Sequence, residues 1–236
     1  MRLARGALLL VGLTSLAATA RAQTSEYSDL ADETVIESPE WGVWEIISVG
    51  PYQPTAIAEA DPPLESLADD NGPLLSTEVD VFLFRIPYVG PLGAGVRAGW
   101  AKYEGPTIDE TTGEEAAEDA KVVIFPITPL ASLRVDVLAR ELNFPLVFTG
   151  KIGLQLIPWN SKKGGQLEEG GSNVEIGLRW SAQVALELDF LEPDSARRLD
   201  EEWGINHSFI FGELFGSTAD LFGDPLAWTM GLGFVY

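Results

Sequence analysis

The residues best suited to chemistry lie near the C-terminal end of the chain. His207, the only histidine, is followed directly by Ser208, and Glu213 comes six residues after the histidine. These residue types form the triad of many hydrolases, in which the imidazole removes the proton of the attacking hydroxyl. His207 and Ser208 are adjacent in a predicted strand, however, and adjacent side chains of a strand point to opposite faces. The spacing favours a His207 that only forms hydrogen bonds, and we predict no catalytic residue.

A second group of carboxylates lies in EGPTIDETTGEEAAED (104–119), which has seven acidic residues and no basic one. We expect this stretch to be a solvated loop, too mobile for paired carboxylates such as Glu114 and Glu115 to act in acid–base catalysis. Binding of divalent cations by the acidic loops is the alternative. The chain has no HExxH sequence, no phosphate-binding loop and no dinucleotide-binding fingerprint. We therefore predict no enzyme, no cofactor and no defined metal site.

Small and polar residues, with charges of both signs, occupy every second position of NVEIGLRWSAQVALELDF (173–190). The residues between them, from Val174 to Phe190, are all apolar. Side chains alternate across a strand with a period of two, so this segment has one apolar face and one polar face. A soluble sandwich and a membrane barrel both produce this alternation, so further features must decide which face is inside.

Eight segments of this kind position the polar residues. They are WGVWEIISVG (41–50), LLSTEVDVFLFRI (74–86), LGAGVRAGWAKY (92–103), KVVIFPITPLASLRVDVLA (121–139), LVFTGKIGLQLIPW (146–159), 173–190, INHSFIFGELF (205–215) and LAWTMGLGFVY (226–236). Pro126 and Pro129 interrupt the fourth segment and imply a bend or a break in its pairing. A strand tilted across a bilayer needs about 9 to 11 residues, so these lengths favour membrane spanning.

The connections between the eight segments alternate in length. They are long after the first, third, fifth and seventh, and mostly short after the others; the exception is 191–204, which has a helix-forming composition. In a barrel with a periplasmic N-terminus, the long connections are external loops and the short ones periplasmic turns. The last segment also ends on an aromatic residue with apolar residues at every second position before it: Trp228, Met230, Leu232, Phe234 and Tyr236. This is the form of the signal by which the barrel assembly machinery recognises its substrates.

These features predict an all-β fold, an eight-stranded antiparallel transmembrane β-barrel with short periplasmic turns and longer external loops. The apolar faces then contact lipid and the polar faces fill the lumen, which in a barrel of eight strands is just wide enough for side chains. Mixed charges can neutralise one another there. The predicted lumen residues are Arg97, Arg134, Asp136, Lys151, Glu175, Arg179 and Glu187.

The N-terminal sequence MRLARGALLLVGLTSLAATARA (1–22) predicts a secretory signal peptide, cleaved near Ala22. Residues 23–40 are predicted to be a disordered leader, and 41–236 the barrel.

Residues 1–22 hold three of the 15 basic residues and none of the 36 acidic ones, so the mature chain carries a formal charge of −24. Such a surface repels nucleic acid. The absence of cysteine excludes disulfides and thiol catalysis.

Four stretches carry a resemblance to a known family: EIISVGPYQP (45–54), LRVDVLARELNFPLVFTGKIGLQLIPW (133–159), LDFLEPDSARRLDEEWGINHSFIFGELF (188–215) and GLGFVY (231–236). The chain resembles the outer-membrane β-barrel proteins typical of myxobacteria and their relatives, over most of its length from Trp41. The resemblance implies an outer-membrane location and a barrel fold. The partners that we expect there are outer-membrane lipid and the barrel assembly machinery. The family has no defined activity, so no function is implied.

Three functions stay open at this point. The first is a structural or surface-interaction role for a barrel with a filled lumen. The second is transport of a small apolar ligand through a lateral opening where Pro126 and Pro129 interrupt the pairing. The third is a lipid-modifying hydrolase that uses Ser208 and His207; the outer-membrane lipid A deacylases place these two residue types two positions apart, and this chain departs from that motif.

Overall fold

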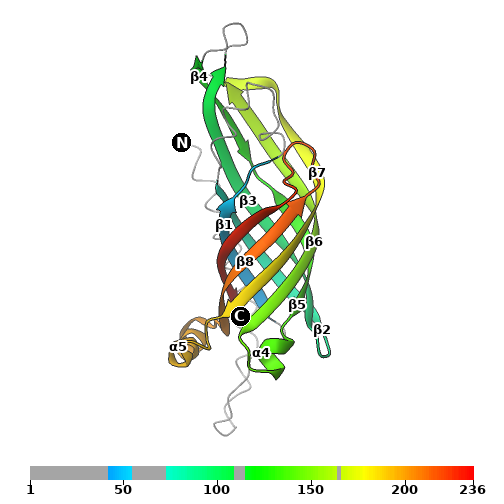
Figure 1. Cartoon of the computed structure of the whole chain (residues 1–236), viewed down its shortest axis with the longest axis vertical. Helices are drawn as coiled ribbons and strands as arrows, with labels where there is room; N and C mark the ends of the chain where they lie inside the picture. The colour runs from blue at the N-terminus through cyan, green and yellow to red at the C-terminus, as the bar shows by residue number, and fades with distance from the viewer. Residues whose placement is uncertain (1–41, 55–72, 109–114, 164–165) are drawn as a thin grey trace. The chain divides into compact units, whose positions relative to one another are not determined.

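A single antiparallel sheet closes on itself to form a barrel in the computed structural model (Figure 1), which describes residues 42–54, 73–108, 115–163 and 166–236. The predicted signal peptide (1–22) and leader (23–40) lie outside the described residues. The strands are β1 (Val43–Pro51), β2 (Pro73–Ile86), β3 (Gly90–Ile108), β4 (Glu115–Ile124), β5 (Ile127–Val135), β6 (Leu146–Lys163), β7 (Gln166–Glu187), β8 (His207–Ser217) and β9 (Ala227–Val235). Strand β1 pairs with both β2 and β9, and this pairing closes the sheet.

Strands β4 and β5 together are one strand of the barrel, broken at Phe125 and Pro126. Both lie between β3 and β6, with β4 on the upper parts of these neighbours and β5 on the lower parts. The predicted eight-stranded antiparallel barrel is thus confirmed. Backbone pairing continues across the break, because Gly99 donates to the carbonyl of Pro126 at 2.7 Å and Phe125 to that of Pro158 at 2.9 Å. The break between β4 and β5 therefore stays bonded to both neighbouring strands.

The apolar face of each strand points outward. On β7, Val174, Ile176 and Leu178 are exposed, whereas Arg179 and Gln183 point inward and are buried. The same holds around the barrel, with exposed apolar side chains that include Ile47, Val49, Leu75, Val81, Val96, Ile152, Leu154, Ile210, Leu214, Met230 and Leu232. This arrangement is the reverse of a water-soluble protein. A closed barrel with such a belt satisfies every backbone group within the wall and suits a lipid environment.

Three connections gather at the lower end of Figure 1: the turn between β2 and β3, and the segments that contain the helices α4 (Val137–Glu141) and α5 (Pro193–Trp203). Helix α5 begins with proline at its first turn and ends at Gly204, whose φ of 69° gives the left-handed cap that glycine favours. Its position agrees with the helix-forming composition of 191–204. No helix among the described residues is long and apolar enough to cross a membrane.

Two predictions about element boundaries are wrong. The strand predicted over 121–139 ends at Val135, and its last residues belong to α4. The segments 104–119 and 160–171 are expected to be loops, but β3 continues to Ile108 and β4 begins at Glu115, while β6 continues to Lys163 and β7 begins at Gln166. Charge and glycine content indicate a loop only where no neighbouring strand supplies hydrogen-bond partners; here the extension of β3 pairs with that of β4, and the extension of β6 with that of β7.

Candidate functional site in the barrel lumen

Six charged side chains meet in the middle of the barrel. They are Glu78 and Asp80 on β2, Arg97 on β3, Lys151 on β6, Arg179 on β7 and Glu213 on β8, and all are buried. Each lies on the inward face of its strand, so the alternation of the sequence brings them together from five strands. Three acids face three bases, and a cluster that is neutral overall avoids an uncompensated charge in a low-dielectric interior.

Arg97 lies at the centre of this lumen cluster. Its Nη1 is 2.5 Å from Glu213 Oε1 and 3.3 Å from Glu78 Oε2. Its Nη2 donates to Ser48 Oγ at 2.9 Å, and its Nε to Ser76 Oγ at 3.2 Å. The guanidinium therefore links β3 to β1, β2 and β8 with charge-assisted hydrogen bonds, which are among the stronger kinds.

The two other cations complete the lumen cluster. Lys151 pairs with Glu78 and lies 3.7 Å from Glu213 Oε2. Arg179 Nη2 is 3.4 Å from Glu213 Oε1, and its guanidinium lies over the ring of Phe215, 3.6 Å from the centroid. A cation over an aromatic face is stabilised by the ring quadrupole, the more so when water is excluded.

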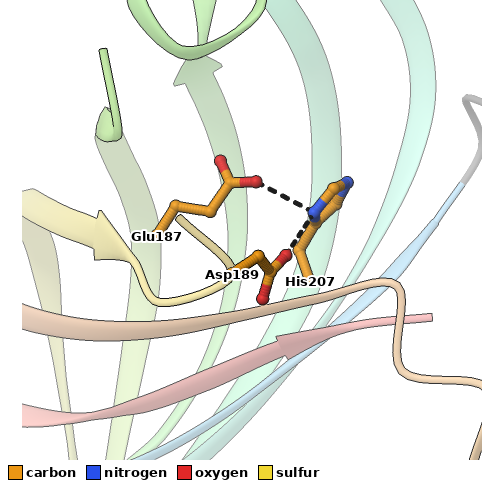
Figure 2. Close-up of side chains that lie close together, drawn as sticks. All are labelled: Glu187, Asp189 and His207. Atoms are coloured by element: carbon orange, nitrogen blue, oxygen red, sulfur yellow. Dashed lines mark hydrogen bonds and ion pairs between the residues drawn. The ribbon is translucent and has the colours of Figure 1, made fainter. Parts of the chain in front are cut away.

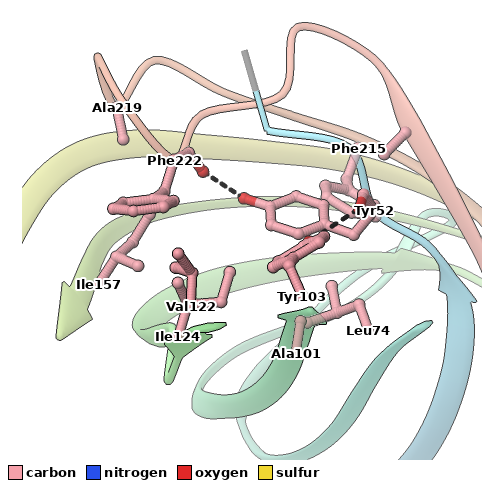
Figure 3. Close-up of a cluster of buried hydrophobic side chains, with 11 residues drawn as sticks. Tyr52, Leu74, Ala101, Tyr103, Val122, Ile124, Ile157, Phe215, Ala219 and Phe222 are labelled. Carbon is pink, nitrogen blue, oxygen red and sulfur yellow. Dashed lines mark hydrogen bonds between the residues drawn. The ribbon is translucent and has the colours of Figure 1, made fainter. Parts of the chain in front are cut away.

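An apolar cluster closes the lumen above the charges (Figure 3). It comprises Tyr52, Leu74, Ala101, Tyr103, Val122, Ile124, Ile157, Phe215, Ala219, Phe222 and Ala227. The Tyr103 hydroxyl donates to the carbonyl of Tyr52 at 2.8 Å, and the Tyr52 hydroxyl to that of Phe222 at 2.5 Å. Glu175 accepts the backbone N–H groups of Leu221 and Phe222, both at 3.1 Å. These bonds hold the connection between β8 and β9 across the upper mouth.

A second apolar cluster closes the lumen below the charges, formed by Trp44, Ile46, Phe82, Val147, Ala185, Phe209, Phe211 and Val235. The buried guanidinium of Arg134 lies between two of its rings, 4.5 Å from the centroid of Trp44 and 4.6 Å from that of Phe209. Little space is left between the clusters. Two cavities of about 10 Å³ border Arg97 and Arg179, each with room for about one water molecule.

The seven predicted lumen residues do not form one network. Arg97, Lys151 and Arg179 belong to the lumen cluster, and Arg134 stacks in the lower apolar cluster. Three predicted members lie at the ends of the barrel: Asp136 binds Arg85 with two hydrogen bonds of 2.8 and 3.0 Å, Glu187 faces His207, and the half-buried Glu175 binds the upper connection. These three lie apart from the lumen cluster, because strand alternation defines a face but not a height along the barrel.

Sequence reasoning missed the acids of the lumen cluster. Glu78 and Asp80 occupy the positions of β2 opposite the apolar Leu75, Val79 and Val81, so the same period of two could have identified them. Glu213 lies on the same face of its strand as Ser217, Phe211 and Phe209, so its inward orientation follows from the same alternation.

His207 is the first residue of β8 and precedes the exposed apolar residues of that strand, which start at Ile210. Figure 2 shows its imidazole beside the carboxylates of Glu187 and Asp189. Its Nδ1 is 2.7 Å from Asp189 Oδ2 and 2.9 Å from Glu187 Oε1. Burial lowers the pKa of His207, but the hydrogen bonds with Asp189 and Glu187 outweigh burial and raise the pKa above its usual value. The donor atoms of the three residues lie within 4.8 Å of one another, so this group could also hold a metal ion.

His207, Ser208 and Glu213, the residues of a possible hydrolytic triad, each bind other residues. Ser208 donates its hydroxyl to Asp189 Oδ1 at 3.1 Å, and Glu213 is bound to Arg97 in the lumen cluster. A serine activated by histidine would instead donate its proton to the imidazole. The geometry therefore favours the hydrogen-bonding role of His207.

The last strand presents the predicted assembly residues outward. Trp228, Met230 and Leu232 of β9 are exposed, and Phe234 and Tyr236 are half-exposed at the lower end. The hydroxyl of Tyr236 donates to Glu45 on the neighbouring β1 at 3.3 Å. Recognition of these residues by the assembly machinery stays a prediction.

No protein-family model matches the chain, and no curated protein matches its sequence. Among solved structures, the chain is similar to the N-terminal β-barrel domain of Pseudomonas aeruginosa OprF, with a TM-score of 0.41 and 11% identity, over 83% of this chain and 99% of that one. It is also similar to Ail, the attachment invasion locus protein of Yersinia pestis, with a TM-score of 0.42 and 13% identity, over 83% and 97% of the two chains. Structural similarity at this level does not indicate a function. The fold rests on the strand pairing, and affiliation with the myxobacterial family stays a prediction.

Proposed function

We propose that the chain is a small outer-membrane barrel whose filled lumen does not conduct, and that it has a structural or surface-interaction role. The filled lumen carries this proposal. From top to bottom, an apolar cluster, a neutral cluster of six charges and a second apolar cluster occupy the interior. Cavities of about 10 Å³ are too small to form a path for hydrated ions.

The outer-membrane location has two supports besides the predicted signal peptide. The apolar belt suits lipid, and a closed barrel is one of the two structures that satisfy their backbone within a bilayer. The paired extensions of β3, β4, β6 and β7 at the upper end give the barrel a surface for contacts outside the membrane (Figure 1). In the topology that we predict, this end faces the cell exterior.

Conductance across a planar lipid bilayer tests the filled lumen. We expect the refolded mature protein to insert without stepwise current, because the two apolar clusters and the lumen cluster fill the lumen and leave cavities of only about 10 Å³ at Arg97 and Arg179. A general porin inserted under the same conditions is the positive control. Insertion of the protein can be verified separately by protection of its strands from protease in vesicles of the same lipid. Reproducible single-channel steps from inserted protein would contradict the proposal.

The two other candidate functions lack a supporting observation. A carrier of an apolar ligand needs an apolar cavity of several hundred Å³, whereas the cavities that border Arg97 and Arg179 measure about 10 Å³ each. The wall stays paired at Pro126. A hydrolase needs Ser208 beside the imidazole, whereas its hydroxyl is bound to Asp189.

A further inference from the structure

We propose that Glu187, Asp189 and His207 form a binding site for one divalent transition-metal ion of the Zn²⁺ class at the lower mouth of the barrel. The ligand atoms are Oε1 of Glu187, Oδ2 of Asp189 and Nδ1 of His207, and all three point toward one another (Figure 2). The site goes beyond the proposed function, because it does not depend on whether the lumen conducts.

Strand pairing positions the three ligands. Glu187 is the last residue of β7, Asp189 follows it by two positions, and His207 is the first residue of β8. The two strands are antiparallel neighbours, with Glu187 opposite Phe209, and Leu188 donates to the carbonyl of Ser208 at 2.8 Å. The backbone on both sides of the site is therefore held by the barrel wall, as a preformed metal site requires.

A single imidazole cannot satisfy both carboxylates. Its Nδ1 lies 2.7 Å from Asp189 and 2.9 Å from Glu187, yet a ring nitrogen carries at most one hydrogen and can donate a well-aligned bond to only one of them. A metal ion, in contrast, accepts an electron pair from each of the three atoms. Two ligands about 2.1 Å from an ion and at the tetrahedral angle that Zn²⁺ favours are about 3.4 Å apart, so each of these two pairs of atoms has to separate by about 0.5–0.7 Å when the ion binds.

The surrounding residues orient the ligands. Ser208 donates its backbone N–H at 3.2 Å and its hydroxyl at 3.1 Å to Oδ1 of Asp189, which leaves Oδ2 for the ion. Outer hydrogen bonds of this kind are usual at metal sites. Arg140 Nη1 lies 3.7 Å from Glu187 Oε1 and competes with the ion for that oxygen, but its side chain is one-third exposed and can turn into solvent.

The ligand types select the class of ion. Imidazole suits Zn²⁺ and the later transition metals, whereas sites that prefer Mg²⁺ or Ca²⁺ use oxygen atoms alone. Two carboxylates and a neutral imidazole also balance the two charges of the ion. We therefore expect Zn²⁺ to bind more tightly than Mg²⁺ at this site.

Calorimetric titration of Zn²⁺ into the mature protein, refolded in detergent micelles and freed of metal with EDTA, tests the site. We expect one saturable site per chain, and at least about 10-fold weaker binding in His207→Ala and in Asp189→Asn. Glu202→Gln, which removes an exposed carboxylate from α5, is the matched control and should bind as the wild type does. Equal Zn²⁺ affinity in the His207 variant and the wild type would overturn the proposal.

A second measurement needs no variant and separates this site from the acidic loops. The chain has one histidine, so protein labelled with ¹⁵N-histidine gives the signals of a single imidazole. We expect one equivalent of Zn²⁺ to shift the Nδ1 signal strongly and to saturate it, with no such shift from the same amount of Mg²⁺. An Nδ1 signal that does not move while Zn²⁺ binds would place the ion elsewhere and overturn the proposal.

Discussion

Glu213 holds the three buried cations of the lumen cluster together. Its carboxylate lies 2.5 Å from Arg97, 3.4 Å from Arg179 and 3.7 Å from Lys151. Like charges repel strongly where water is excluded, and a shared carboxylate offsets that repulsion. Removing one partner of a buried ion pair is costly, because the remaining charge stays buried without compensation.

We expect Glu213→Gln to lower the free energy of unfolding by about 3–5 kcal/mol, since Arg97, Lys151 and Arg179 would then face only Glu78 and Asp80. Unfolding in urea, followed by tryptophan fluorescence in micelles, measures the change. Glu202→Gln removes the same charge from the surface of α5 and should leave the midpoint unchanged. A Glu213 variant as stable as the wild type would show that the other two acids are sufficient.

Strand β3 has small residues on its inward face where its neighbours have large ones. Gly95 lies opposite Asp80 of β2, and a methyl group added to it would overlap with the Asp80 carboxylate and with the carbonyl oxygen of Val79. The glycine therefore leaves room for the long charged side chains of the lumen.

We expect Gly95→Val to prevent formation of the closed barrel, because the overlap involves backbone atoms that cannot move aside. Ala94→Val makes a similar change one residue earlier, on the exposed outward face, and should fold normally. A folded barrel migrates at different positions in an SDS gel before and after boiling. We expect unboiled Gly95→Val to migrate at the position of the boiled protein. If both variants fold equally well, the interior is less tightly packed than the structure indicates.

The molecule as a whole closes where its first and last strands meet. Strand β1 pairs with β9 from Trp44 opposite Val235 to Val49 opposite Met230, and the C-terminal strand therefore completes the barrel. No disulfide contributes, since the chain has no cysteine. Closure depends on backbone pairing and on the packing of the two apolar clusters.

We expect Tyr236→Ala to reduce the amount of folded protein in the outer membrane of cells, while folding of the purified chain in micelles is retained. The side chain makes one hydrogen bond, to Glu45, so its loss affects recognition during assembly more than stability. Tyr88→Ala, at an exposed turn position, is the control. Equal membrane levels of the two variants would argue against an assembly signal at Tyr236.

The period of two in the sequence determined the strands and which residues share a face, whereas the strand lengths, the alternating connections and the last strand indicated a barrel with its apolar face outward. Alternation depends only on the local geometry of an extended chain, which is why residues such as Ile176 and Arg179 could be assigned to opposite faces from the sequence. The break at Pro126 was predictable for another local reason, because proline lacks the N–H that strand pairing requires.

Only the tertiary structure decided which inward residues meet. Glu78, Arg97 and Glu213 come together because closure brings strands that are distant in sequence to the same height across the lumen, and alternation carries no information about height. The group of Glu187, Asp189 and His207 depends likewise on the pairing of β7 with β8 across an intervening helix. Contacts of this kind follow from the register and tilt of the closed sheet, which are properties of the whole barrel.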